Sequence, residues 1–142
     1  MKKLFECIPY KKVGDFIFGM PRKQALDLIG DPTISCMYGY PMENRFEDDF
    51  PGIHLYCNPK ELLEYVEMYP GVTEDEYVFV YDDIEIILTK DIDDMIAQLN
   101  KITDDLTTDE DKETYSSKKL GLEFYCLNGV VENIMFQDAG IV

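Results

Sequence analysis

The chain reads GIHLYCNPKELLEYVEMYPG from Gly52 to Gly71, and it repeats this pattern as GLEFYCLNGVVENIMFQDAG from Gly121 to Gly140. Both copies place a Tyr-Cys pair five residues into the segment, and the second copy has a turn one residue shorter. Self-similarity of this kind is the signature of a duplicated supersecondary unit. The two copies therefore predict two equivalent β-hairpins.

Side chains alternate along the outgoing strand of each predicted hairpin. Because successive residues of a strand point to opposite faces, the apolar residues of each strand share one face. These residues are Ile53, Leu55 and Cys57 in the first copy, and Leu122, Phe124 and Cys126 in the second. We expect His54, Tyr56, Glu123 and Tyr125 on the opposite face, and the two cysteines to be buried as small hydrophobic side chains.

A strand and a helix are predicted before each hairpin. In the first half, the apolar segment 13–20 precedes Pro21, which suits the first turn of a helix over 22–29. In the second half, a strand or strand pair over 77–88 precedes a helix over 91–102, which Asp91 can cap. The sequence thus predicts a single α+β domain over residues 1–142. Two βαββ-like units, at about 13–71 and 77–140, would pack their helices on a mainly antiparallel sheet.

Charge is the second informative feature, because the chain has 29 acidic and 13 basic residues and a formal net charge of −16. This charge argues against nucleic acid or an anionic membrane surface as a ligand. It favours a basic protein partner, whose approach it would steer, although an acidic surface can also serve solubility alone. The start, MKKLFECIPYKK, has no apolar signal region, and no run approaches the ~18 residues of a membrane span. We therefore expect a cytoplasmic protein, whose four separated cysteines remain free thiols.

Residue patterns that carry catalytic or cofactor chemistry are absent from the sequence. It contains no GxSxG motif and no glycine-rich phosphate loop, and its acidic clusters do not fit the spacing of a calcium loop. The single histidine, His54, has no nucleophile beside it in the sequence. We therefore expect a protein that is not an enzyme and that holds no cofactor or metal.

Two long connections between a helix and its hairpin are the expected recognition segments. The first, over 33–51, mixes aromatic and acidic residues, as protein interfaces do. The second, over 103–119, is strongly acidic. The candidate partner-binding residues are Tyr38, Tyr40, Glu43, Glu47, Asp48 and Asp49 in the first, and Asp104, Asp105, Asp109 and Asp111 in the second. Alternatively, the aromatic residues fold back onto the sheet as a second layer.

The segment Gly14 to Pro32, GDFIFGMPRKQALDLIGDP, together with the GLEFY start of the second hairpin, resembles small bacterial proteins found among the immunity proteins of polymorphic toxin systems. The tandem organisation is also similar to the β-lactamase-inhibitor-protein-like architecture, although this chain has one clear helix per half and no disulfide. The resemblance implies a binding protein and supplies no catalytic residue.

The leading hypothesis is a stoichiometric inhibitor of the immunity type, monomeric or homodimeric, whose acidic face covers the basic active site of a nuclease-like toxin. One alternative is a small-molecule-binding module that uses His54, Tyr56, Glu123 and Tyr125. Another is a protein that associates with itself through an exposed strand edge.

Overall fold

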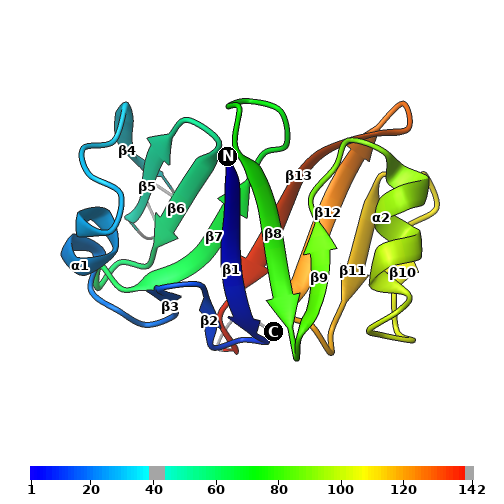
Figure 1. Ribbon diagram of the computed structural model, residues 1–142. Coiled ribbons are helices and arrows are strands. Elements are labelled where there is room, and N and C mark those ends of the chain that lie inside the picture. Colours follow the sequence, from blue (N-terminus) through cyan, green and yellow to red (C-terminus); the bar gives the residue numbers. More distant parts are fainter. Residues whose placement is uncertain (39–43, 140–142) are drawn as a thin grey trace.

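Two β-sheets lie one over the other in the computed structural model, which describes residues 1–38 and 44–139 (Figure 1). Within these ranges, the smaller sheet has the strand order β3-β2-β1-β8-β9 and the larger has the order β10-β11-β12-β13-β7-β6-β5-β4. The smaller sheet consists of β1 (Lys2–Ile8), β2 (Lys12–Val13), β3 (Phe16–Ile17), β8 (Glu76–Tyr81) and β9 (Ile84–Ile87). The larger consists of β4 (Ile34–Tyr38), β5 (Arg45–Phe50), β6 (Ile53–Cys57), β7 (Leu63–Met68), β10 (Thr107–Thr108), β11 (Thr114–Ser117), β12 (Leu122–Leu127) and β13 (Val130–Gln137).

The α+β prediction is wrong, because the protein is 49% strand and only 11% helical. The helices α1 (Arg22–Asp27) and α2 (Ile92–Leu99) lie at opposite ends of the molecule and do not cover a sheet (Figure 1). The small sheet takes that place: Phe79 of β8 packs on Phe136 of β13, with their ring centroids 4.8 Å apart. The expected Asp91 cap is present, since its carboxylate accepts the backbone N–H groups of Asp93 and Asp94. Neither helix has the length and apolarity needed to cross a membrane.

The repeated hairpins meet at the centre of the large sheet, where β7 pairs with β13. The two long connections over 33–51 and 103–119 form β4–β5 and β10–β11, so each half contributes a four-stranded meander. Both outgoing strands carry an irregularity at their Tyr-Cys pair. Each return strand also bonds to the residue two before the first residue of its helix, through Leu63 N–H to Met20 O and Val131 N–H to Lys90 O. The two halves are therefore built alike.

Strand β1 breaks this likeness. It lies in the middle of the small sheet, pairing antiparallel with β2 and parallel with β8 (Figure 1). The strands on its two sides have unequal lengths, since β2 and β3 have two residues each whereas β8 and β9 have six and four. The small sheet therefore covers the second half of the large sheet more fully than the first.

The predicted faces of the two hairpin strands are confirmed. The apolar residues of β6 and β12 are buried between the sheets, including Cys57 and Cys126. The aligned glycines at the strand starts, Gly52 and Gly121, both have positive φ angles of 81° and 65°. A Cβ at Gly52 would collide with the Tyr77 hydroxyl, and one at Gly121 would press on the Tyr10 ring. These two positions need glycine both for backbone conformation and for space.

Candidate functional site

The large sheet has one open face, which points away from the small sheet and carries polar and aromatic side chains. His54 and Tyr56 lie on this face because their neighbours on β6 point into the core. One row of side chains crosses the open face from edge to edge, following the register of the strands. Its members are Ile34, Asp49, His54, Glu67, Met135, Glu123, Ser116 and Thr107.

Three carboxylates surround the imidazole of His54. Its Nδ1 lies 3.2 Å from Asp49 Oδ1, 3.5 Å from Glu67 Oε1 and 3.7 Å from Glu47 Oε2. The acids come from β5 and β7, the two strands that flank β6. The sheet register therefore concentrates negative charge around the single histidine of the chain. We call Glu47, Asp49, His54 and Glu67 the histidine cluster.

Glu67 is the most firmly held member of the histidine cluster. Its Oε1 accepts hydrogen bonds from the hydroxyls of Tyr56, at 2.6 Å, and Tyr69, at 2.7 Å. Its Oε2 accepts one from the Asn133 amide at 2.9 Å. The Tyr69 ring also packs on His54, with a centroid distance of 4.6 Å. Three donors on β6, β13 and the end of β7 thus fix this carboxylate, which is only 5% exposed.

Burial and mutual repulsion shift the protonation of this cluster. Burial raises the pKa of Glu47 to about 7, and the neighbouring Asp49 carboxylate adds to the shift. Burial, together with the hydrogen bond to Glu67, raises the pKa of both Tyr56 and Tyr69. The two hydroxyls therefore remain protonated and act as hydrogen-bond donors to Glu67. Asp49 Oδ1 is buried and accepts no hydrogen bond from the described residues.

A groove of about 380 Å³ opens beside the histidine cluster. Asp49, His54 and Tyr69 line one part of it. Apolar residues line the rest, among them Ile34 and Val72, which are 58% and 59% exposed. The cluster is therefore reached from solvent along an apolar surface.

The first group of predicted partner-binding residues divides between the two faces of the large sheet. Glu47 and Asp49 lie on the open face, and Tyr38 of β4 packs edge-on against Tyr56 with a centroid distance of 6.1 Å. Asp48 is fully buried on the other face, where Arg22 holds it with two hydrogen bonds of 2.7 Å and Ser35 donates a third. Tyr40 and Glu43 lie outside the described residues.

The second group lies at the opposite edge of the large sheet, around β10 and β11. Asp104 is exposed and forms an ion pair with Lys119, and Asp111 is exposed. Asp105 instead accepts hydrogen bonds from Ser117, Thr103 and the Lys119 backbone N–H. The Asp109 carboxylate accepts hydrogen bonds from the backbone N–H groups of Glu113 and Thr114 and so closes a turn. The structure does not bring the two predicted groups together.

The residues predicted for the small-molecule alternative all lie on the open face. Tyr56 and Tyr125 occupy matched positions of β6 and β12, and Glu123 lies in the same row as His54. Sequence reading missed Glu67, Tyr69 and Asn133. Glu67 lies on β7, and Tyr69 directly follows this strand. Both alternate with the apolar Val66 and Met68, and this alternation could have placed them on the open face.

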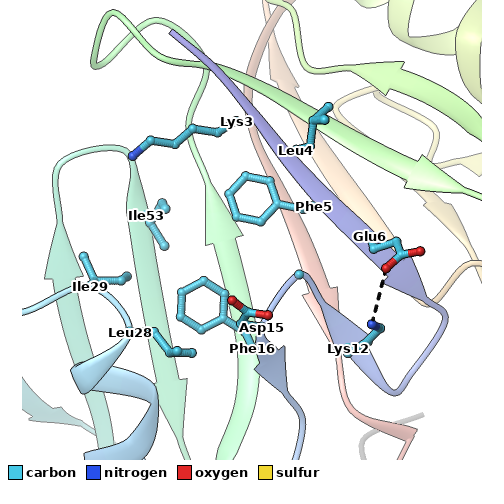
Figure 2. A pocket seen from close by; sticks show the side chains of 11 residues that line it. Lys3, Leu4, Phe5, Glu6, Lys12, Asp15, Phe16, Leu28, Ile29 and Ile53 are labelled. Atoms are coloured by element: carbon cyan, nitrogen blue, oxygen red, sulfur yellow. Dashed lines mark ion pairs between the residues drawn. The ribbon is translucent and has the colours of Figure 1, made fainter.

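A separate pocket of about 450 Å³ lies on the other side of the molecule, between β1, β2 and α1 (Figure 2). Phe5, Phe16 and Ile53 form its apolar centre, and Lys3, Asp15 and the Glu6–Lys12 ion pair lie around it (Figure 2). The pocket lies where the short strands β2 and β3 leave the first half incompletely covered.

Comparison of the chain with protein-family models, with curated proteins and with solved structures gives no match.

Proposed function

We propose that this protein is a stoichiometric protein-binding module whose open face takes up a basic protein partner. The supporting observation is the concentration of tyrosines and carboxylates on that face. The tyrosines are Tyr38, Tyr56, Tyr65, Tyr69 and Tyr125, all partly exposed, and the carboxylates are Glu47, Asp49, Glu67 and Glu123.

The tyrosines are suited to anchor a partner because their neighbours already hold them in place. Tyr56 packs edge-on against Tyr38 and Tyr65, with centroid distances of 6.1 and 6.2 Å. Tyr56 and Tyr69 are further fixed by Glu67. Side chains ordered before binding lose little conformational entropy when a complex forms, and tyrosine is enriched among the residues that dominate binding energy.

Charge supplies the partner's chemical class. A net charge of −16 attracts a basic protein and speeds its association, and the carboxylates of the open face favour one orientation. In the most specific form of the proposal, the protein is an immunity-type inhibitor. Its open face would cover the basic active site of a nuclease-like toxin and mimic the charge of the nucleic acid.

Two double variants, each with two acidic residues replaced by their amides, test this proposal at a pH above the raised pKa of Glu47. The variant Glu47→Gln/Asp49→Asn changes the open face, and the variant Asp104→Asn/Asp111→Asn changes the far edge of the same sheet. A partner is first captured with the wild-type protein and with each variant. Its association rate with each protein is then measured over a series of salt concentrations. We expect the first variant to slow association with a basic partner at least about tenfold and the second to change it much less.

A captured partner that binds both double variants equally would contradict the use of this face. A salt-independent association rate of the wild-type protein would contradict electrostatic steering. For the inhibitor form, the captured partner must degrade nucleic acid when free and lose this activity at a 1:1 ratio with the wild-type protein.

The pocket in Figure 2 favours a second candidate function, the binding of a small apolar molecule. Titration with the dye 8-anilinonaphthalene-1-sulfonate, followed by fluorescence, tests it. Leu28 lines the pocket and is 45% exposed, so Leu28→Glu should weaken dye binding without loss of the fold. Equal dye binding by the variant and the wild-type protein would place the dye elsewhere.

A further inference from the structure

The histidine cluster has the donor atoms and the spacing of a metal site. One imidazole nitrogen and two carboxylate oxygens, from His54, Asp49 and Glu47, lie within 4.8 Å of one another. Zinc binds such donors at about 2.0–2.2 Å, which separates neighbouring donors of a tetrahedron by about 3.3–3.5 Å. The distances from His54 Nδ1, 3.2 Å to Asp49 and 3.7 Å to Glu47, bracket this value.

A second observation is a buried carboxylate oxygen beside the imidazole. Asp49 Oδ1 is buried and accepts no hydrogen bond from any described residue. Buried polar atoms in folded proteins are almost always paired, and an unpaired carboxylate oxygen is costly. This oxygen lies 3.2 Å from His54 Nδ1. A protonated His54 can pair with this oxygen, and a metal ion bound to the neutral imidazole would supply the same positive charge.

Neighbouring side chains restrict the movement of the His54 imidazole. Glu67 lies 3.5 Å from His54 Nδ1 and is itself fixed by Tyr56, Tyr69 and Asn133. The Tyr69 ring supports one side of the imidazole. An imidazole that is held in place before binding loses less conformational entropy when it takes up an ion. The side chains of Glu47, Asp49 and His54 are 20–25% exposed, so an ion can enter from the adjacent groove.

We propose that Glu47, Asp49 and His54 form a binding site for a divalent transition-metal ion, of which zinc is the best representative. Three protein donors leave one tetrahedral position for another ligand, and two of the donors, Asp49 and His54, line the groove. The mixed nitrogen and oxygen donor set favours zinc over calcium or magnesium, which take oxygen ligands alone. This site shares Glu47 and Asp49 with the proposed partner-binding face, but all three of its donors come from one chain, so it can be tested without a partner.

The matched half of the sheet supplies a control. Ser116 and Glu123 occupy the row positions of Asp49 and His54 there, and Met135 occupies that of Glu67. The same framework without an imidazole is therefore present in the same molecule. Cys36 of β4 lies opposite Glu47 and is exposed, so its thiol is the alternative zinc ligand to exclude.

The test is a calorimetric titration of purified protein, stripped of metal with a chelator and then dialysed, with zinc chloride. We expect one zinc per chain, and an affinity at least about tenfold lower for both His54→Ala and Asp49→Asn. Glu123→Gln and Cys36→Ser should bind as the wild-type protein does. The visible spectrum of the cobalt-loaded protein should show tetrahedral coordination.

Absence of zinc binding by the wild-type protein would overturn the proposal, as would unchanged affinity in both His54→Ala and Asp49→Asn. Loss of binding in Cys36→Ser alone would assign the zinc to the thiol. Tighter binding of calcium than of zinc would overturn the assignment to a transition metal. Circular dichroism verifies that each variant is folded. If His54→Ala is unfolded, the zinc affinity of Asp49→Asn, which keeps the shape of the side chain, tests the proposal. The purified chain alone gives this result, so it does not depend on any protein partner.

Discussion

The two halves of the large sheet share a framework and differ in chemistry. Each half contributes a four-stranded meander, with a glycine at the start of its third strand and a Tyr-Cys irregularity near its end. Only the β4–β7 half collects a histidine and three carboxylates on the open face. In the β10–β13 half, the corresponding side chains do not surround an imidazole. The repeated residues therefore build the sheet, and the unrepeated ones are where function is to be sought.

The inner face shows a similar contrast. In the first half, Asp48 lies opposite Leu55 and is buried with Arg22 as its partner. At the matched position in the second half, Tyr115 lies opposite Phe124 and stacks on it, with the ring planes inclined by 6°. One half fills this position with an ion pair and the other with aromatic packing.

The largest expected effect comes from breaking the buried ion pair. Removal of one partner leaves a buried charge unpaired, so Arg22→Ala should lower the free energy of unfolding by about 3 kcal/mol. Lys119→Ala removes the exposed partner of Asp104 in the other half and should have no measurable effect. Urea denaturation of both variants makes the comparison. Equal stabilities would show that Asp48 does not depend on Arg22.

A smaller effect is expected at the repeated tyrosines. The Tyr56 hydroxyl donates to the buried Glu67 carboxylate at 2.6 Å, whereas that of Tyr125 lies 3.4 Å from Glu113. Tyr56→Phe should therefore lower the free energy of unfolding by about 1.5–2 kcal/mol. Tyr125→Phe should leave it unchanged. A similar loss in both variants, measured by thermal unfolding, would contradict the assignment of Tyr56 as a support of the histidine cluster.

The smallest effect is a pH dependence in the second half. Burial opposes the ionisation of Asp105, but hydrogen bonds from Ser117, Thr103 and the Lys119 backbone outweigh it and lower the pKa to about 2. A folded-state pKa below the ordinary value of 3.8 adds stability above that pH. This contribution is lost as pH falls from about 4 to 2. Urea midpoints of wild-type protein and Asp105→Asn should therefore converge over that interval, and a constant difference would contradict the prediction.

Local pattern was enough to predict the hairpins and their faces. Alternation along Ile53, Leu55 and Cys57 identified the buried side, and Asp91 was recognised as a helix cap. The sequence alone places Glu47, Asp48 and Asp49 together as partner-binding residues, because no strand is predicted over them. As strand β5 it alternates, and Asp48 is turned into the core.

Pairing between distant segments could not be read from the sequence. From the sequence, the segment KKLFECI, Lys2 to Ile8, is considered only as a possible signal region, yet it forms β1 and pairs with β8. Because β1 is not predicted, the α+β prediction contains no second sheet and instead packs the helices on the hairpins. The histidine cluster depends in the same way on the register of β5, β6 and β7, which brings Glu67 next to His54.

The place of β1 also determines how the chain can reach its folded state. Lys2 pairs with Glu76 and Glu6 with Val80, so the central strand of the small sheet must wait for a partner from the second half. Closing so long a loop is slow, because its entropic cost precedes any favourable contact. Separate expression of the halves would leave β1 without β8 and would expose the edges of β7 and β13. Despite its internal repeat, the protein is thus expected to fold as one cooperative unit, in which neither half is a self-sufficient module.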